Sequence, residues 1–491
     1  MSVARVSKHT NGRPFLLLRP DPDVSETSIQ NCNMNRRSFI QKSALAGAAT
    51  AFTAASYAQI AGANERVRMG IIGFGLIGRI HTRSFHGLKE SKVVAVSDCY
   101  RPRLDACVEL VGPDCAKVPD FRRLLERKDV DAVVVAPGDH WHAMQTMLAC
   151  DAGKDVYLEK PMHLFVREGE WMQKVAGRTK RVVQVGTQQR SAPHYKKAKE
   201  LLRGGAIGNV VSVQCNFFRN VMPGIGNPPD ADAPADLNWD MLLGPAPQHR
   251  YNPNRALYHF RWFWDYSGGQ MTNLGHHSLD IVHWIFDIAA PKAVSSSGGR
   301  YFLKDNGEVP DSQDAIIEYP KFNTIVQFRE CAAGAGVSSM GSLTFMGTKG
   351  TMTLGRDGYV ILPDKKIDPI NAFAHIIGGH PVGGPQPVPE VEGEFWTGKA
   401  EDKSGDWKQQ YVDHAQNFLD CVKSRKTPNS DLASSHWVST TCHLANISAR
   451  TGRKIVWDAV ANDVVGDKAA SAMLKRPYRA PWDKSLKALL S

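Results

Sequence analysis

The sequence predicts an α/β domain with a doubly wound parallel sheet, followed by an α+β domain with a large, open and mostly antiparallel sheet. Three observations predict this fold class. Short apolar strands alternate with helical segments between residues 66 and 190, which is typical of a parallel sheet with helices on both faces. A glycine-rich turn joins the first of these strands to the first helix. After residue 209 the strands are longer and alternate apolar with polar residues, as in an antiparallel sheet.

Length and composition are those of a soluble globular protein with more than one domain. The chain has 491 residues, of which 42% are hydrophobic and 22% are charged. Its formal net charge of +11 is scattered and forms no basic run, so we do not expect nucleic acid as a partner. The nine cysteines include no CxxC pair and several lie in apolar segments, which predicts buried free thiols.

The first 58 residues form an extension that is similar to an export signal. Arg36 and Arg37 precede a run rich in Ala, Gly, Ser and Thr that ends at Ala58. A basic pair ahead of a mildly apolar stretch predicts recognition by the twin-arginine translocase and a periplasmic location. Leu and Ile are too sparse in this stretch for a permanent membrane span. We expect translation to start at Met34; the alternative to a signal is an ordinary basic tail.

The glycine-rich turn has the spacing and the setting of a dinucleotide-binding fingerprint. It follows an apolar strand over 66–72 and opens a helix that extends to about Leu88. In G-x-G-x-x-G the first glycine permits a tight turn, the second lets a pyrophosphate approach the backbone, and the third lets the helix pack closely on the strand. The pyrophosphate then lies at the positive end of the helix. The residues that we expect at the cofactor here are Gly73, Phe74, Gly75, Leu76, Ile77 and Gly78.

An acidic residue at the end of the next strand favours NAD(H) over NADP(H). Asp98 directly follows a strand over 92–97 and lies about 20 residues beyond the last glycine, as the fingerprint requires. Its carboxylate can accept hydrogen bonds from both ribose hydroxyls and would repel a 2′-phosphate. Arg101 and Arg103 follow closely and keep NADP(H) as the alternative. The other interpretation of the turn is a glycine-rich loop in a different α/β fold.

Strands and helices continue to alternate through the rest of the first domain. Strands are expected over 131–136, 155–159 and 182–186, with helices over 140–150 and 170–179. Ligands of such sheets bind at the carboxyl ends of the strands, where two loops carry polar residues. The candidate cofactor residues in these loops are Pro137, His140, His142, Glu159 and Lys160.

The second domain is expected to be built on one large sheet. We assign residues 66–190 to the first domain, 191–475 to the second, and 476–491 to a tail that packs back on the body. A Pro- and Gly-rich loop over 219–258 is long enough to form a wall of the cleft, and an amphipathic helix is expected over 411–424. The expected strands of the sheet span 209–217, 293–302, 314–319, 323–330 and 342–345.

From about residue 66 to about residue 482 the chain resembles the Gfo/Idh/MocA oxidoreductase family. The resemblance rests on several motifs taken together, which are the glycine turn, the loop that ends in His142, Glu159-Lys160-Pro161, Gly204–Gly208 and Gly268–Asp280. It implies an NAD(P)-dependent oxidoreductase with its cofactor on the first domain and its substrate on the second. It also implies a homodimer or homotetramer, in which the sheet of the second domain pairs the subunits.

The resemblance assigns a catalytic lysine. In this family the lysine of Glu-Lys-Pro lies beside the nicotinamide and the reacting carbon, and here that residue is Lys160. A cationic nicotinamide next to it should lower the pKa of the amine and help it to take a proton. Without the resemblance, Lys160 would be interpreted as a surface lysine that follows a strand.

The same resemblance assigns two further catalytic candidates to a helix that begins near Met271. Asn273 and His277 are four residues apart and therefore share a helix face. The family often has Asp where this chain has Asn273, and an amide can orient a hydroxyl but cannot accept its proton. This departure places the proton transfer on His277 and Lys160. The alternative role for His277 is that of a hydrogen-bonded core histidine.

Five other polar residues are weaker candidates for substrate contact, and no metal is expected. They follow the last strand of the first domain or lie around the histidine helix, and they are Arg190, Tyr195, Tyr266, His276 and Asp280. Core packing is the alternative for the two tyrosines. Five histidines could suggest a metal, but they lack an accompanying Cys or carboxylate set at ligand spacing, and the family needs no metal, so a metal site is not predicted; they are His140, His142, His276, His277 and His283.

These expectations converge on a sugar or a glycoside as the substrate. The family includes sugar and inositol dehydrogenases, an exported glucose–fructose oxidoreductase and NAD-dependent glycosidases. An exported protein has no supply of free NAD, which predicts a tightly retained cofactor that is regenerated in each cycle. Three functions stay open: hydride transfer from a sugar hydroxyl, glycoside hydrolysis through transient oxidation, elimination and re-reduction, and non-catalytic binding on the same fold.

Overall fold

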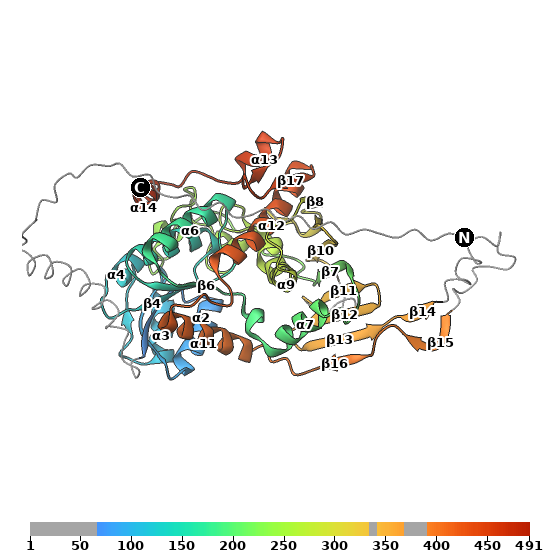
Figure 1. The fold of residues 1–491 in the computed structure, drawn as a ribbon. Coiled ribbons are helices and arrows are strands. Elements are labelled where there is room, and N and C mark those ends of the chain that lie inside the picture. The colour runs from blue at the N-terminus through green and yellow to red at the C-terminus, as the bar shows by residue number, and fades with distance from the viewer. Residues whose placement is uncertain (1–65, 333–340, 368–389) are drawn as a thin grey trace, which may run out of the picture. The chain divides into compact units, whose positions relative to one another are not determined.

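Two sheets form the framework of the protein, one in each predicted domain (Figure 1). The structure is a computed structural model that describes residues 66–332, 341–367 and 390–491. The extension with the expected export signal lies outside these residues. No helix in the described ranges is long and apolar enough to cross a membrane.

The first sheet, within the described residues, has six parallel strands in the order β3-β2-β1-β4-β5-β6. The strand order reverses between β1 and β4, and such a switch point is where doubly wound sheets bind their ligands. All four residues of β4 are buried, because helices cover both faces of the sheet, and this explains their unbroken apolar run. The strands are β1 (Val67–Ile72), β2 (Ser91–Ser97), β3 (Ala116–Lys117), β4 (Ala132–Val135), β5 (Asp155–Leu158) and β6 (Val183–Val185).

Helices from both ends of the chain cover this sheet. One face packs against α2 (Leu76–Gly87), α3 (Arg101–Val111) and α11 (Gln409–Ser424). The other face packs against α4 (Phe121–Leu125), α5 (His142–Asp151), α6 (Val166–Thr179) and α14 (Trp482–Leu490). The predicted helix over 411–424 is therefore present as α11, but it packs on the first domain rather than on the second.

The C-terminal tail packs back on the first domain, as predicted. The hydroxyl of Tyr478 donates a hydrogen bond of 2.7 Å to Glu168 Oε1. The ring of Trp482 lies edge-on to Trp141, with 4.7 Å between the ring centroids. These contacts fix the tail close to the loop that follows β4.

The second sheet is open and mostly antiparallel, which confirms the predicted fold class. Its ten strands among the described residues follow the order β16-β13-β12-β11-β7-β10-β9-β8-β17-β18, and only β7 and β10 run parallel. The bounds are β7 (Val210–Phe218), β8 (Ala293–Gly299), β9 (Ser312–Glu318), β10 (Asn323–Arg329), β11 (Leu343–Gly347), β12 (Gly350–Gly355), β13 (Gly358–Pro363), β16 (Ala400–Asp402), β17 (Ile455–Asp458) and β18 (Asp463–Val464).

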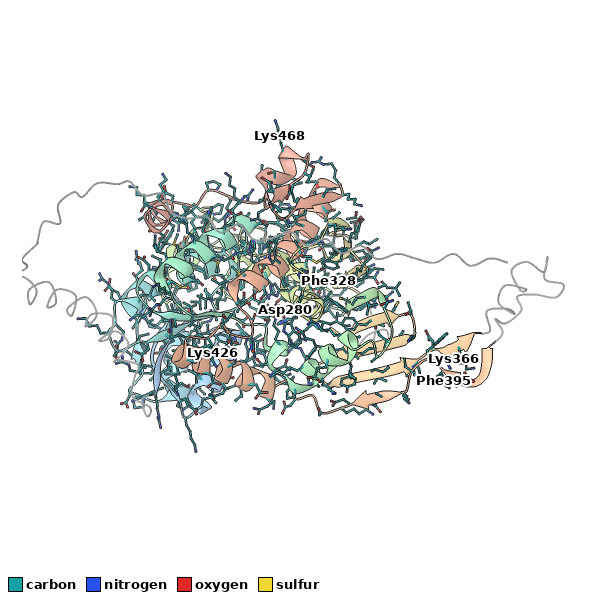
Figure 2. The ribbon with its side chains drawn as sticks, in the orientation of Figure 1. Asp280, Phe328, Lys366, Phe395, Lys426 and Lys468 are labelled. Carbon is teal, nitrogen blue, oxygen red and sulfur yellow. The ribbon has the colours of Figure 1, made fainter. Side chains whose placement is uncertain are left out.

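Three helices cover one face of the second sheet and form its core. They are α7 (Pro193–Arg203), α9 (His276–Phe286) and α12 (Leu432–Thr451). The long helix α12 begins at Asp431, whose carboxylate accepts a hydrogen bond from the Ser434 amide, and it ends at Gly452 in a left-handed conformation. Two further strands, β14 (Lys365–Ile367) and β15 (Glu390–Phe395), pair separately, and Figure 2 marks Lys366 and Phe395 on them, away from Asp280 in α9.

Candidate active site

A cavity of about 330 Å³ lies between the two domains, at the carboxyl ends of β1, β4 and β5. The first domain contributes the turn after β1, the loop after β4 and the residues after β5. The second domain contributes Asn273, His277 and four residues of the segment 257–261. The structure therefore brings the glycine turn and the predicted catalytic residues to one cavity.

The glycine turn has the geometry that a dinucleotide needs. Gly73 has φ +88°, and a Cβ atom there would lie 2.6 Å from the Ala136 carbonyl oxygen. A Cβ atom on Gly78 would overlap the Gly73 carbonyl oxygen, so only glycine lets α2 approach β1 this closely. A Cβ atom on Gly75 would have its nearest neighbour at 3.6 Å, and the residue lines the cavity. A pyrophosphate can therefore approach the amino end of α2.

Two residues of the predicted fingerprint, Phe74 and Gly78, support the turn from the core side and do not line the cavity. The ring of Phe74 is buried in the core of the first domain, and its amide donates a 2.8 Å hydrogen bond to Asp98 Oδ2. Gly78 also lies outside the cavity lining, whereas Gly73, Leu76 and Ile77 belong to it. The predicted role of Phe74 is thus limited to its backbone.

Asp98 lies at the end of the cavity where a ribose would bind. Its Oδ1 accepts a 3.0 Å hydrogen bond from the Tyr100 amide, and Arg103 Nη1 lies 3.6 Å from its Oδ2. Burial raises the pKa of this carboxyl group, although the neighbouring Arg103 and the two amides oppose that effect. The carboxylate fits a ribose diol, and Arg103 is the residue that would meet a 2′-phosphate.

The Glu159 carboxylate is held in place by neighbouring protein side chains. His81 Nε2 lies 2.6 Å from its Oε1, and Gln188 Nε2 donates to the same oxygen at 3.2 Å. Burial raises the pKa of Glu159, but the hydrogen bond and charge of His81 and the charge of Lys160 outweigh it, so the pKa is lowered overall. A fixed carboxylate therefore lies next to Lys160.

Lys160 crosses from the first domain to the helix of the second. Its Nζ donates two hydrogen bonds of 3.0 Å to one residue, to the backbone oxygen and to the side-chain Oδ1 of Asn273. Burial lowers the pKa of the amine, and the charge of Glu159 opposes this shift. A lysine with a lowered pKa, held by two uncharged oxygens, can take up or release a proton near the cofactor.

His277 enters the same cavity one turn further along the chain. Its Nδ1 has no hydrogen-bond partner among the described residues. Burial, with the charge of Lys160 as the next cause, lowers the pKa of the imidazole well below 6.5, so the ring is neutral near pH 7. A neutral imidazole that lines the cavity can accept a proton from a substrate hydroxyl.

The first turn of the predicted histidine helix differs from an α-helix. Met271–Gly275 (η5) is π-helical and continues into α9 at His276. Asn273 and His277 both reach the cavity across this wider turn. Single π-helical turns of this kind occur frequently at functional sites.

The loop after β4 contributes three predicted residues to the cavity wall. Pro137, His140 and His142 all line it. His140 Nε2 lies 2.9 Å from the Leu242 carbonyl oxygen, and burial lowers its pKa to about 3. His142 Nδ1 lies 2.6 Å from the carbonyl oxygen of Pro161, which follows Lys160. Because that oxygen can only accept, His142 carries its proton on Nδ1 and orders the backbone there.

The match to known families comes from both domains. An oxidoreductase family description with an NAD-binding Rossmann fold matches residues 67–187, and the description of its C-terminal α/β domain matches residues 195–297 and 395–484. Together the two matches span well over half of the chain. The chain belongs to the Gfo/Idh/MocA oxidoreductase family.

Two named relatives show how much of each chain the sequence similarity covers. The chain is 35% identical to inositol 2-dehydrogenase 1 of Saccharopolyspora erythraea over 169 residues, which are 32% of this chain and 50% of that protein. It is 28% identical to inositol 2-dehydrogenase of Acidothermus cellulolyticus over 306 residues, 61% of this chain and 75% of that protein. It thus spans about half the length of the first curated relatives it matches.

A solved structure supports the fold of the two domains together. Levoglucosan dehydrogenase in complex with NADH and levoglucosan superposes with a TM-score of 0.58. The comparison covers 80% of this chain and 99% of the other, at 16% sequence identity. The NAD-binding parallel domain and the antiparallel sheet domain are therefore a shared family architecture.

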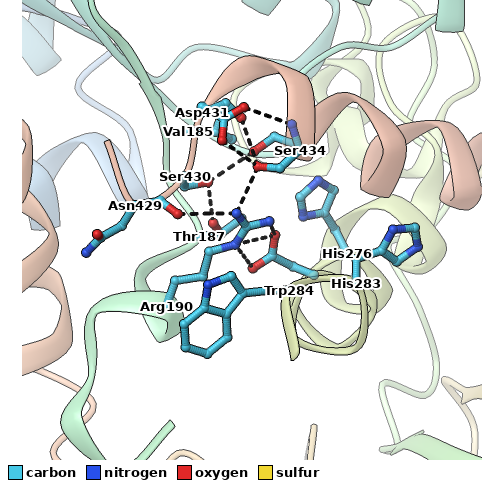
Figure 3. Close-up of polar contacts among 12 residues, drawn as sticks. Val185, Thr187, Arg190, His276, His283, Trp284, Asn429, Ser430, Asp431 and Ser434 are labelled. Atoms are coloured by element: carbon cyan, nitrogen blue, oxygen red, sulfur yellow. Dashed lines mark hydrogen bonds and ion pairs between the residues drawn. The ribbon is translucent and has the colours of Figure 1, made fainter. Parts of the chain in front are cut away.

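The five weaker candidates for substrate contact lie outside the lining of the cavity. Arg190 and Asp280 form a buried ion pair in which Nη2 and Oδ1 are 2.6 Å apart. Arg190 also donates to the Asn429 carbonyl oxygen and to Ser434 Oγ, as Figure 3 shows. Because both residues are buried and lie outside the cavity lining, the pair joins the two domains and does not face a ligand.

The other three candidates also have structural partners. The hydroxyl of Tyr195 accepts a 2.5 Å hydrogen bond from Gln189 Nε2, and its ring is fully buried. Tyr266 packs on His140, with 5.1 Å between ring centroids. His276 Nε2 lies 3.0 Å from Ser439 Oγ in α12. Each side chain is turned into the core, so a substrate role for it has no support from the geometry.

Sequence reasoning did not identify the residues that form the outer wall of the cavity. Tyr258 is the last residue of the long Pro- and Gly-rich loop and Arg261 follows it, and Asp139 and Tyr411 also line the cavity. Only the length of that loop pointed to a wall, because no periodic pattern marks individual residues in it. Among the described residues, no three His, Cys, Asp or Glu side chains are grouped so that they could hold a metal ion.

Proposed function

We propose that the protein oxidises a hydroxyl group of a sugar or glycoside with a bound NAD cofactor. The observation that carries this proposal is the meeting of Lys160, Asn273 and His277 in one cavity with the glycine turn. The names of the relatives support the substrate class, since inositol and levoglucosan are a polyol and a sugar derivative.

The residues of the cavity would bind the cofactor, transfer the proton and position the reacting groups. When bound, NAD supplies the hydride acceptor. The turn from Gly73 to Gly78 and Asp98 would hold its pyrophosphate and ribose. His277, which is neutral and lines the cavity, accepts the hydroxyl proton, and Lys160 stabilises the oxygen or takes the proton in turn. Asn273 holds Lys160 in position and cannot itself accept a proton.

We further propose that the cofactor is retained and that the chain is exported by the twin-arginine pathway. The motif around Arg36 and Arg37 supports export, and a compartment without free NAD requires retention. The face of the second sheet away from α7, α9 and α12 is the proposed homo-oligomer surface. It exposes Ile316, with 45% of its surface accessible. Light scattering of the purified protein would read the oligomer mass directly.

The first experiment determines what the purified protein carries. The protein is dialysed and denatured, and the released nucleotide is identified by mass and absorbance. Stoichiometric NAD(H) supports retention, whereas an empty protein that binds NAD weakly contradicts it. A sugar and polyol panel is then assayed for reduction of the cofactor.

The matched variants are Lys160→Met and Lys426→Met. Lys426 is exposed and does not line the cavity. We expect Lys160→Met to lower kcat by about 100-fold or more at unchanged NAD content, because general acid–base groups contribute 10²- to 10⁴-fold. Lys426→Met should keep full activity. Equal activity of the two variants would contradict the assignment.

Product analysis of the same reactions separates the two catalytic alternatives. Nitrophenyl glycosides that release nitrophenol without net NADH would indicate hydrolysis through transient oxidation. Net NADH with an oxidised sugar would indicate a dehydrogenase.

A further inference from the structure

The outer wall of the cavity carries an arginine that the proposed reaction does not yet use. Arg261 lies in the short helix η4 (His259–Trp262) and lines the cavity. Its guanidinium carbon lies 4.2 Å from the centroid of the Tyr258 ring and 5.1 Å from that of Phe260. Its Nη1 donates a 2.6 Å hydrogen bond to the Tyr258 carbonyl oxygen. These contacts fix the plane of the side chain and leave Nε and Nη2 without protein acceptors among the described residues.

The charge of Arg261 has no carboxylate partner within ion-pair distance in the described part of the chain. The two acidic residues at the same end of the cavity already have other partners. Asp139 Oδ2 accepts a 2.5 Å hydrogen bond from the Ser267 hydroxyl. Glu159 Oε1 is bound by His81 at 2.6 Å. A partly buried guanidinium with free N–H groups is costly unless something else binds it.

Arg261 is located at the catalytic end of the cavity and not at the pyrophosphate end. Arg261 directly follows Phe260, whose ring lies 3.5 Å from where a Cβ atom on Gly138, in the loop after β4, would be. The arginine at the other end is Arg103, which lies 3.6 Å from Asp98 Oδ2 and 3.6 Å from the corresponding position on Gly75. The anionic groups of the dinucleotide belong at the glycine turn. The partner of Arg261 is therefore to be found in the substrate and not in the cofactor.

The backbone that presents Arg261 is fixed by its surroundings. Leu257 has φ +50°, a conformation that a leucine adopts only when neighbouring contacts impose it. Residues on both sides of Leu257 are anchored to Glu308: Arg255 forms an ion pair with it at 2.8 Å, and the Trp264 amide donates a 3.0 Å hydrogen bond to it. Strain of this kind, held at a cavity wall, is typical of a binding segment.

We propose that Arg261 binds a carboxylate of the substrate, so that the substrate is an acidic sugar or an acidic glycoside of the uronic acid type. The free Nε and Nη2 form the fork that a carboxylate matches with two parallel hydrogen bonds. Tyr258 and Phe260 supply the apolar surface beside it on which a sugar ring can lie. This proposal rests on the proposed function, since it names the substrate class of the same site.

The test compares acidic and neutral forms of the same sugars on the enzyme loaded with NADH. Binding of D-glucuronate, D-galacturonate, D-glucose and D-galactose is followed through the fluorescence of the bound nucleotide. We expect the acids to bind about 10- to 100-fold more tightly than their neutral counterparts, as for a hydrogen-bonded charged group. Acids that bind no better than neutral sugars would overturn the proposal. So would D-glucose 6-phosphate if it bound better than D-glucuronate.

Three variants assign the preference to one side chain. Arg261→Gln should remove the preference for the acids and change the binding of neutral sugars by less than about threefold. Arg261→Lys keeps the charge without the fork and should keep part of the preference. The control is Arg450→Gln, because Arg450 also lies over an aromatic ring, 4.9 Å from Trp264, but outside the cavity lining. An equal loss for acids and neutral sugars in Arg261→Gln would contradict the proposal.

Measuring the turnover of the same sugars distinguishes failure of the proposed oxidoreductase function from failure of the proposed carboxylate site. If the acids bind preferentially but no sugar reduces the NAD-loaded enzyme, the oxidoreductase function fails while the carboxylate site stands. If neutral sugars are oxidised as well as the acids are, the function stands and the carboxylate site fails.

Discussion

At the residue scale, the ammonium of Lys160 is held by two uncharged oxygens of Asn273 and not by a carboxylate. A carbonyl and an amide favour the charged lysine less than a carboxylate would. Burial therefore determines the direction of its shift, and the pKa falls. The site thus combines a lysine that loses its proton readily with a histidine, His277, that is already neutral.

Substitutions at position 273 should move the pH dependence of the reaction in opposite directions. Asn273→Asp places a negative charge against Lys160 and raises its pKa, so the acid limb of the kcat/KM profile should move to higher pH by about 1 to 3 units. Asn273→Leu removes one acceptor of the ammonium, lowers the pKa and should move the limb to lower pH. The measurement is kcat/KM for the oxidised sugar over a pH series.

The exposed Asn323→Asp is the control for the effect of charge alone, and its profile should match that of the parent protein. Shifts in the same direction for both changes at position 273 would show that Lys160 does not set the limb.

At the element scale, helix α12 fixes the backbone that follows Lys160. Ser439 Oγ accepts a 3.1 Å hydrogen bond from the Met162 amide. His443 Nε2 lies 2.9 Å from the His163 carbonyl oxygen, and His163 Nε2 lies 3.1 Å from His436 Nδ1. One face of α12 therefore holds a buried row of neutral histidines against the segment 160–163.

This row should make the stability of the protein depend on pH. Burial lowers the pKa of His436 and of His443 to about 4 in the folded chain, from 6.5 in the unfolded one. The unfolded chain therefore binds more protons, and the free energy of unfolding should fall as the pH falls from 6.5 towards 4. Each of the two histidines accounts for roughly 3 kcal/mol at the acid end. Thermal unfolding at a series of pH values measures the loss.

His443→Gln tests whether α12 is the source of this dependence. Glutamine can still donate to the His163 carbonyl oxygen but does not titrate, so Tm should depend less steeply on pH below 6.5. His86→Gln changes an exposed histidine and should leave the slope as it is. An unchanged slope in His443→Gln would place the acid sensitivity elsewhere.

At the scale of the whole molecule, the proposed export depends on the N-terminal extension and not on the two folded domains. Twin-arginine recognition depends on the guanidinium pair, so the double change Arg36→Lys and Arg37→Lys should keep the protein in the cytoplasm of a host with this translocase. The control is the pair Arg122→Lys and Arg123→Lys, which changes two adjacent exposed arginines of the folded body and keeps the same charges. Fractionation of cells that express the full chain, with NAD content measured in each fraction, gives the result. Export of the first variant would reject the signal.

The first domain could be predicted from sequence because its information is local. Each main strand is a short buried run, and the glycine turn marks its own position between strand and helix. β3 was missed since two residues carry no period. The second domain was harder: α12 is rich in Ser, Thr and His and shows no clear apolar stripe, although it is almost entirely buried. The extent of the sheet beyond β11 was missed because its short strands are separated by glycine turns.

The site residues likewise divide into those that a local motif marks and those that only the fold reveals. Lys160, Asn273 and His277 could be named because they stand in motifs that the family shares. Arg190 and Asp280 were assigned to the substrate because an isolated sequence cannot show that two charges 90 positions apart satisfy each other. Arg261 was missed for the opposite reason: its importance comes from partners that it lacks, and only the folded structure shows them.

The π-helical turn at Met271–Gly275 makes the active site sensitive to chain length as well as to chemistry. A π turn holds one residue more than the α-helical turn that it replaces. Loss of a single residue there would convert the wider turn into an α-helical turn and change which backbone groups face the cavity. The carbonyl oxygen of Asn273 would then leave Lys160 although Lys160, Asn273 and His277 were all still encoded. In this segment, a deletion that spares all functional residues should be as damaging as the replacement of one of them.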